Sequence, residues 1–553
     1  MPMYSIRANL ASPLFPFTTE FWGRSIIVPQ YDENFDRTTL NAPGVVIDKG
    51  IPQTYYMHNC LPTPQGYQAV GYKQVLPDDA CNSVVGQNDF DVAFPLQNAN
   101  GNKFLFVPAA GKNYIFDAQI GRWMSISPFA VGRVTSATLV TTAFVQGQTY
   151  IYYALIGCFI YDDVNKVLTP VTLTALDTTK VLGIAAASGY MIAFTKNNVA
   201  WSSLTTPTDF TPDLSTGAGG GAVSDQKGDI VACLPISGGF IVYCQINAVA
   251  ARFSGNILFP FIFKEIPGSA GIVEIADVSW HSNLAYHLVW NGAGIQQLTL
   301  GSTTQLYPEA TDFLAGEVFE DFDESSNSLS TSYLLHPLDV SVAIISSRYF
   351  VLSYGVQPGE FTHALVFDLE LSRWGKLKVN HRNCFQYTFP NLFGPITYGQ
   401  LTRVTYGDLA QTTYGELGAT LNSFDSFKHS LAFLQADGEV LTVDFSFGEE
   451  AADGVLILGK YQFIRMQRLE HQMTEVDIVR PDAEVDSPFA LFIIPTQDGK
   501  TFQAPVPTFQ TNAGLKTRQF RKIINAQNLS FLFRGAFNLT SVNFEFTLGG
   551  YTK

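Results

Sequence analysis

The chain has 553 residues, too many for one hydrophobic core, so two or three domains are expected. Charged residues make up only 15% of the sequence, against roughly 25% in a typical soluble protein, which suggests that neighbouring molecules cover much of the surface. The net charge of −15 argues against nonspecific attraction to nucleic acid.

The cysteines and the apolar runs exclude several protein classes. The six cysteines are scattered, without a Cys-x-x-Cys pair or matching histidines, so neither a zinc site nor a disulfide framework is expected: Cys60, Cys81, Cys158, Cys233, Cys244 and Cys384. Most of them are expected to be small buried hydrophobes. The start of the chain lacks the apolar stretch of a secretory signal, and no run approaches about 18 apolar residues. A soluble or assembled protein, made in the cytoplasm and without a membrane span, is predicted.

Residues 1–90 are irregular and rich in Pro, Tyr and Asn, which predicts an extended N-terminal segment laid over another surface. Residues 91–455 contain seven pairs of short apolar runs joined by turns, the signal of β-hairpins. The pairs are 103–107 with 113–116, 149–155 with 158–161, 191–194 with 199–201, 239–244 with 248–253, 283–289 with 294–298, 349–353 with 362–367, and 430–434 with 439–443.

Residues 456–553 differ in character, since their apolar runs are interleaved with charged residues. Strands are predicted at 460–471, 475–479, 489–494, 530–533 and 542–547, and basic residues gather at Lys516, Arg518, Arg521 and Lys522. We expect a separate C-terminal domain that resembles a small β-sandwich.

One sequence motif occurs twice, about 250 residues apart. Residues 115–123 and 366–374 both run from a strand through Asp117 or Asp368 and a polar turn into Arg-Trp, and residues 159–168 give a weaker version. The aspartate should accept hydrogen bonds from the turn, and Trp123 or Trp374 should pack between sheets. Repeated units of this kind predict an all-β protein with a β-propeller of six or seven blades and insertions. A β-sandwich array, with the repeat as coincidence, is the alternative.

The sequence contains no strong match to a known catalytic motif. The sequence has no Gly-x-Ser-x-Gly elbow and no His-Glu-x-x-His, so no catalytic, metal-binding or cofactor-binding residue is assigned and no enzyme activity is expected. His281 and His287 flank a predicted strand start and are interpreted as structural. The glycine run 217–221 lacks the Lys-Ser/Thr of a phosphate loop and is interpreted as a flexible connection between blades.

The densest acidic run covers residues 317–324. Its carboxylates are Glu317, Glu320, Asp321, Asp323 and Glu324. Calcium binding would need the alternating oxygen spacing of an EF-hand loop, which this run lacks. A solvated acidic loop is one interpretation. The other is the lining of a passage along which DNA slides without sticking.

Several segments together resemble the tail nozzle of short-tailed bacteriophages, also called the tail hub or tail tubular protein B. The resemblance covers about two thirds of the chain and rests on the order of short motifs: residues 56–72, residues 197–210, the Phe-Asp…Arg-Trp-Gly-Lys stretch (Phe367, Asp368, Arg373, Trp374, Gly375, Lys376), residues 498–502, Arg518, Arg521 and the final Leu-Gly-Gly at 548–550. Residues 385–425 match nothing in the family and are expected to form an insertion outside the propeller.

The resemblance implies a structural component of the virion tail. It would form a homohexameric tube below the portal adaptor protein, with tail fibres or spikes at the side and a tail needle or plug beneath. Double-stranded DNA would be retained and then ejected through the tube without specific binding. The five acids of 317–324 are then candidates for the channel lining, because a basic wall would bind phosphates and stall the DNA. The implied parts are 1–90, contacting tube and adaptor, the propeller at 91–455, and the C-terminal β domain at 456–553.

Two other hypotheses remain. A carbohydrate-binding or glycosidase-like β-propeller, acting as a receptor-binding protein, would need a central pocket with aromatic platforms and two facing carboxylates. Trp123, Trp201 and Trp374 are candidate platforms, although their positions at strand starts favour packing. A cellular scaffold of the kelch type ranks last, because the sequence lacks a Gly-Gly doublet in each blade.

Overall fold

The computed structural model describes most of the chain, and the regular secondary structure of the described residues is almost entirely β-strand, as predicted. They are 3–9, 26–27, 45–47, 54–76, 92–97, 103–109, 112–117, 122–126, 139–162, 165, 167–315, 317–323, 328–333, 340–355, 361–387, 430–436, 438–444, 454–478, 489–496, 506–511 and 517–551. Among these residues, none of the helices reaches the length and apolarity that crossing a bilayer requires.

Within the described residues, seven groups of four antiparallel strands succeed one another, and we call them meanders 1 to 7. Meander 1 is β8–β11 (Phe94–Gln97, Lys103–Ala109, Lys112–Asp117, Arg122–Ile126), and meander 2 is β12–β15 (Val140–Val145, Gln148–Tyr153, Gly157–Asp162, Val167–Val171). Meander 3 is β16–β19 (Gly183–Ala187, Tyr190–Phe194, Asn198–Trp201, Gly219–Ala222), and meander 4 is β20–β23 (Ile230–Ile236, Gly239–Cys244, Ala248–Phe253, Phe261–Glu265).

Meander 5 is β24–β27 (Val278–Ser279, His287–Trp290, Ile295–Leu298, Thr303–Leu306), preceded by the short helix η2 (Ile275–Asp277) and followed by α2 (Pro308–Ala315). Meander 6 is β30–β33 (Val340–Ile345, Tyr349–Tyr354, Phe361–Asp368, Arg373–His381). Meander 7 combines β34–β36 (Asn383–Tyr387, Ser430–Leu434, Val440–Asp444) with β7 (Gly71–Leu76), which precedes meander 1 in the chain.

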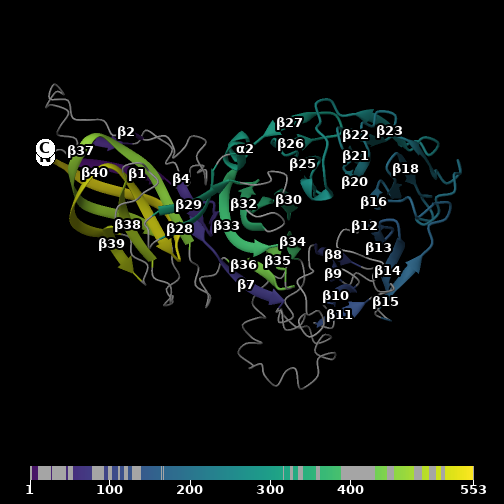
Figure 1. The fold of residues 1–553 in the computed structure, drawn as a ribbon, viewed down its shortest axis with the longest axis horizontal. Helices are drawn as coiled ribbons and strands as arrows, with labels where there is room; N and C mark the ends of the chain where they lie inside the picture. The colour runs from purple at the N-terminus through teal and green to yellow at the C-terminus, as the bar shows by residue number, and fades with distance from the viewer. Residues whose placement is uncertain are drawn as a thin grey trace, which may run out of the picture.

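The meanders follow one another round a circuit, with their first strands innermost and their fourth strands outermost (Figure 1). The first strands contact each other in turn, β12 with β16, β16 with β20, β24 with β30 and β30 with β34. β34 also lies against β8, where the amide of Ala93 donates to Asn383 Oδ1 at 3.3 Å. The last meander therefore returns to the first.

Separate hydrophobic cores lie between consecutive meanders. Six clusters of buried side chains each join two neighbours, from meanders 1 and 2 through to meanders 6 and 7, and the last two clusters also include residues of the terminal strands. Phe106 and Tyr153, for example, meet edge-on between meanders 1 and 2, with ring centroids 6.4 Å apart. Each meander is thus stabilised by stacking its faces on two neighbours.

The seven predicted hairpins are all present as antiparallel pairs. One boundary was wrong, because the strand expected from residue 283 begins at His287. A turn precedes it, in which the amide of Leu284 donates to the carbonyl of His281 at 3.0 Å. The polar His-Ser-Asn sequence favours that turn over an extended strand.

The repeated motif forms the same hairpin in three meanders, the one that connects the third strand to the fourth. Asp117 pairs with Arg122, Asp368 with Arg373 and, in the weaker copy, Asp162 with Val167. The repeat predicted from the sequence therefore has one common register.

In the copy at 366–374, the expected contacts are confirmed. Asp368 is fully buried, and its Oδ1 accepts from the amides of Glu370 at 3.0 Å and Leu371 at 2.9 Å. Ser372, the last turn residue, has a φ of 54°, and the equivalent residue of the first copy is glycine, which adopts this conformation without strain.

Strands from both ends of the chain share a further sheet with meander 6. The C-terminal strands are β37 (Gly454–Ile478), β38 (Phe489–Thr496), β39 (Val506–Thr511), β40 (Thr517–Gly535) and β41 (Asn538–Tyr551). The N-terminal strands are β1 (Met3–Asn9), β2 (Ile26–Ile27), β3 (Val45–Ile47), β4 (Thr54–His58), β5 (Cys60–Pro62) and β6 (Tyr67–Ala69). β1 pairs with β41, while β2 and β4 pair with β37.

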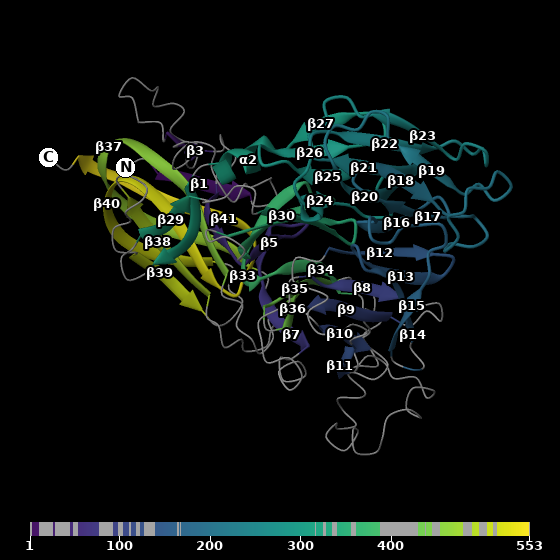
Figure 2. The ribbon, with the colours of Figure 1, turned by 45° about the vertical axis from the view of Figure 1, so that its right-hand side comes forward.

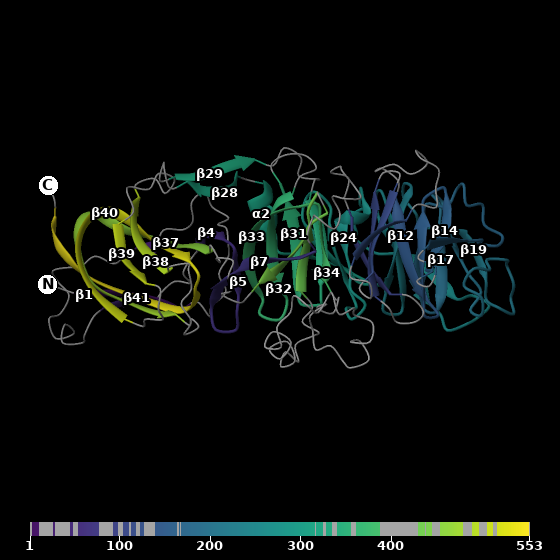
Figure 3. The same cartoon turned by 90° about the horizontal axis from the view of Figure 1, so that it is seen from below.

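Hydrogen bonding passes from β33 through β5 and β6 to β41, so the terminal strands and meander 6 form one 15-stranded sheet. Figure 3 shows β37 and β40 curving strongly at one end of the molecule. The strands predicted at 460–471 and 475–479 are parts of the single strand β37, because no Gly, Pro or Asn turn separates them. The bounds of the three predicted domains stay a prediction, and the motif at residues 498–502 lies outside the described residues.

Candidate functional site

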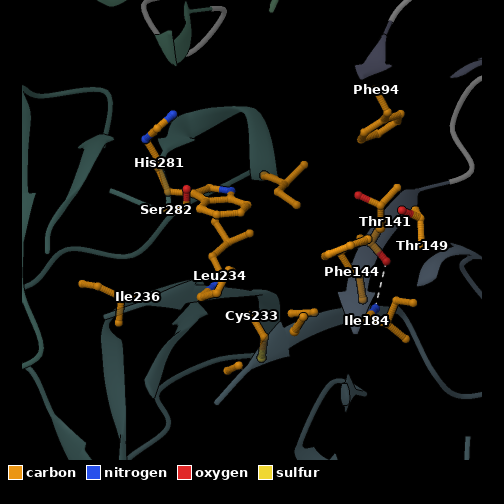
Figure 4. A pocket seen from close by; sticks show the side chains of 18 of the residues that line it. Phe94, Thr141, Phe144, Thr149, Ile184, Cys233, Leu234, Ile236, His281 and Ser282 are labelled. Atoms are coloured by element: carbon orange, nitrogen blue, oxygen red, sulfur yellow. Dashed lines mark hydrogen bonds between the residues drawn. The ribbon is translucent and has the colours of Figure 1, made fainter. Parts of the chain in front are cut away.

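A cavity of about 880 Å³ lies among the first strands of the meanders. β8, β12, β16 and β20 supply much of its wall, and the segment before β25 and Gln386 of β34 complete the described lining. Figure 4 shows side chains from these separate strands facing one space. The cavity therefore occupies the inside of the circuit, where several meanders meet.

The described wall is mainly apolar, with some Ser, Thr, His and Gln side chains. It contains Leu234, Ile236 and the aromatic side chains of Phe144 and Trp280, which are 54% and 39% exposed. No Asp, Glu, Lys or Arg occurs among the residues described as lining it. Hydrolysis of a glycoside by two facing carboxylates would need groups that this part of the wall does not supply.

A glycine lets the first strands of meanders 2 and 3 approach closely. A Cβ added at Gly183 would lie 2.9 Å from Thr141 Cγ2 and 2.8 Å from the ring of Phe194. At this contact the amide of Ile184 donates to Thr141 Oγ1 at 2.8 Å, the bond drawn in Figure 4. The threonine thus satisfies an edge amide that the ladder of β16 leaves unpaired.

The two histidines interpreted as structural have different surroundings. His287 is buried, with Nδ1 2.8 Å from the hydroxyl of Tyr243 and Nε2 donating to the carbonyl of Pro235 at 2.9 Å. Burial lowers the pKa of His287 to about 4, so its ring is neutral at pH 7 and joins meanders 4 and 5. His281 instead lines the cavity, and its Nδ1 accepts from the amide of Asn283 at 3.2 Å.

The cysteines of the described residues behave as buried hydrophobes, as expected. Five are buried and unbonded to one another: Cys60, Cys158, Cys233, Cys244 and Cys384. Cys233 reaches the cavity wall, where burial raises the pKa of its thiol well above the usual value. Cys81 lies outside the described residues. No group of three or more His, Cys, Asp and Glu among the described side chains is arranged to hold a metal ion.

The acidic run is a strand rather than the loop that was one interpretation. Glu317–Asp323 forms β28, which pairs with β29 (Ser328–Tyr333) in a separate two-stranded hairpin. Val318, Phe319 and Phe322 interrupt the acids and favour extended structure. The side chains of Glu317, Glu320, Asp321 and Asp323, and all of Glu324, lie outside the described residues. Their place in a channel lining therefore stays a prediction.

The glycine run was wrongly interpreted as a flexible connection. Gly219–Ala222 forms β19, the fourth strand of meander 3. The indole of Trp201 lies over Gly219, where an added Cβ would be 3.4 Å from the ring, and its Nε1 donates to the carbonyl of Gly217 at 2.9 Å. The tryptophan therefore packs on this strand, and at Gly220 an added Cβ would lie 2.8 Å from the carbonyl oxygen of Val199 on the neighbouring strand.

The tryptophans proposed as sugar platforms serve packing where they are described. Trp374 is fully buried, with its ring centroid 4.9 Å from that of Phe367 and 5.5 Å from that of Tyr307. Trp201 is half-buried against Phe261 of the neighbouring meander. The side chain of Trp123 lies outside the described residues. Sequence reasoning missed Trp280, which lines the cavity directly after β24 in a segment that carries no motif.

Comparison with known proteins leaves the family open. No family model and no curated protein matches the chain. Among solved structures, U3-55K matches at 7% identity with a TM-score of 0.38, over 67% of this chain and 98% of its own. The extracellular domain of a one component system from B. thetaiotaomicron matches at 10% identity with a TM-score of 0.40, over 91% and 64%. Apo AztD from Citrobacter koseri matches at 9% with a TM-score of 0.30, over 52% and 89%. None of these three is named as a tail protein.

Proposed function

We propose that the seven meanders are the blades of a seven-bladed β-propeller. Three observations support this architecture: the first strands of five meanders line the cavity, a hydrophobic core lies between consecutive meanders, and β34 lies beside β8. β7 would close the ring of blades, because this strand precedes the first blade in the sequence but pairs with β36 of the last blade. A propeller needs such closure, since its blades are held only by their neighbours.

We infer that the protein is a structural component of a virion tail. In this proposal it forms the hexameric nozzle below the portal adaptor of a short-tailed bacteriophage, and viral DNA is retained and ejected through it. The observation that carries the proposal is the sheet built from both chain ends. Its strand β37 has 25 residues and a contour of about 80 Å, several times the usual strand length. Strands of this length suit the wall of a tube.

Composition supports the same assignment. Few charges and many aromatic residues suit large permanent contacts, with copies of the chain, the adaptor, fibres or spikes, and a needle or plug. The net charge of −15 suits a conduit that DNA must leave without binding. No catalytic step is required, because the proposed role is mechanical.

The conduit is tested with virions whose nozzle lacks the acidic run's charges. The variant combines Glu317→Gln, Glu320→Gln, Asp321→Asn, Asp323→Asn and Glu324→Gln. We expect DNA ejection, timed by a DNA-binding dye, to slow several-fold. The uncharged wall repels the DNA phosphates less, so the DNA contacts the wall more often. Virions with Asp177→Asn and Asp229→Asn, two exposed acids in the connections of the meanders, should eject at the normal rate. An unchanged rate in the five-residue variant would contradict the lining.

A carbohydrate-binding propeller is the second candidate, favoured by the exposed rings of Trp280 and Phe144 in the cavity. Aromatic faces of this kind can stack on sugar rings. The described lining offers no carboxylates, so this candidate would bind a glycan without hydrolysing it. A glycan-array screen without hits would remove it.

A further inference from the structure

The loop between β22 and β23, residues 254–260, exposes three large apolar side chains in a row. Ile257 is 42% exposed, Leu258 is 48% and Phe259 is 70%. Phe253 and Ile262, at the ends of the two strands, are 40% and 58% exposed. Scattered apolar residues are ordinary on a protein surface, but five in one hairpin mark an interaction site.

Hydrogen bonds hold this loop in one shape. The amide of Ser254 donates to the carbonyl of Pro260 at 2.8 Å, and the Ser254 hydroxyl donates to the carbonyl of Phe259. The side chain of Asn256 accepts from the amide of Leu258 at 3.0 Å, and its carbonyl accepts from the amide of Phe259 at 3.1 Å. Several backbone groups are therefore satisfied within the loop, which lowers the cost of moving it into an apolar phase.

Basic residues border the apolar tip. The eleven residues from Phe253 to Phe263 carry no charge, and exposed Arg252 and Lys264 stand on either side of them. Arg252 donates to the carbonyl of Leu300 through Nη2 at 3.0 Å and Nε at 3.4 Å, which orients its guanidinium at the base of the hairpin. The acid next to Lys264 is Glu265, which is paired with another lysine.

A neighbouring turn extends the apolar surface. Ile257 packs against Gly217, where an added Cβ would lie 2.9 Å from Ile257 Cγ1. Leu214 of the same turn is 69% exposed. The acid of this turn, Asp213, accepts from the amide and hydroxyl of Ser215, both at 2.8 Å. β22 and β23 lie on the side of the molecule away from both chain ends (Figures 1 and 2), so this surface is separate from the shared sheet.

We propose that this hairpin is a membrane-interface anchor that inserts the Ile257–Phe259 tip between lipid headgroups. Arg252 and Lys264 would then meet lipid phosphates. A lipid surface is favoured over a protein groove because the tip is uncharged, consecutive and convex, whereas its cations form a border at the depth of the headgroups. The anchor lies on the interface and does not cross the membrane. It is independent of the proposed nozzle function.

The test is flotation of the full chain with vesicles of phosphatidylcholine alone or mixed equally with phosphatidylglycerol. We expect wild type to float with the vesicles, and more strongly with the anionic mixture. The variant Ile257→Ser/Leu258→Ser/Phe259→Ser should bind about 100-fold more weakly, because it loses the buried apolar surface. Arg252→Gln/Lys264→Gln should lose about 10-fold on anionic vesicles and little on neutral ones.

The control is Leu155→Ser/Val167→Ser, which removes side chains that are 52% and 45% exposed on meander 2 and should leave flotation unchanged. Phe259→Trp adds a second measurement, since its emission should shift to the blue with vesicles. Absence of flotation in wild type, or equal flotation of the triple variant, would overturn the proposal. Loop-dependent self-association without lipid, seen by sedimentation velocity, would assign the loop to a second copy and also overturn it.

Discussion

Replacing Trp374 with alanine is expected to lower the free energy of unfolding by about 3–5 kcal/mol, measured by urea denaturation. The side chain is fully buried in the core between meanders 5 and 6, against Phe367 and Tyr307. That core also includes Ile457 and Leu532 of the terminal strands. The loss should therefore destabilise both the circuit and its junction with the long sheet.

The matched control is Trp280→Ala. This tryptophan lies in the cavity wall and is 39% exposed, so its removal leaves no closed void. We expect a loss below about 1 kcal/mol. Equal losses in the two variants would contradict the assignment of Trp374 to an inter-sheet core.

Replacing Asp368 with alanine is the second substitution with a large expected effect, a loss of about 3 kcal/mol. Its Oδ2 accepts from Arg348 at 2.8 Å and 3.0 Å, and its Oδ1 accepts from the amides of Glu370 and Leu371. The variant leaves two turn amides and part of a guanidinium without their acceptor. Urea denaturation measures the loss.

Asp162 holds the same hairpin position in meander 2, which makes Asp162→Ala an internal control. Its carboxylate accepts from Asn165 at an exposed position, at 3.0 Å from the amide and 2.7 Å from the side chain. We expect a loss of about 1 kcal/mol or less, because water replaces these bonds. Equal losses in the free energy of unfolding for the two variants would contradict the claim that burial makes the Asp368 contacts the stronger ones.

Local patterns in the sequence predicted much of the circuit. Alternating apolar runs and turn residues located all seven hairpins, because a hairpin is specified by neighbours in the chain. The Asp-turn-Arg-Trp repeat also predicted the contacts of Asp368 and Trp374, since both depend on a turn and an adjacent strand. No local pattern predicted that β7 pairs with β36 in meander 7, because the two strands are more than 350 residues apart.

The parts that the sequence predicted poorly depend on tertiary contacts. Gly219 lies in a strand that pairs with β18 and contacts Trp201, whereas its glycine-rich composition alone indicates a loop. The cavity arises where β8, β12, β16 and β20 converge, so no single segment reveals it. The exposure of Phe259 was equally invisible, since an apolar run in a hairpin usually indicates a core.

An electron-microscope image of the protein in its native assembly, with the copies counted, tests the central claim most directly. The proposal predicts a six-fold ring on a short tail, with seven-bladed discs outside a tube formed by the long strands. A free monomer in the native source would contradict the nozzle and favour the sugar-binding propeller.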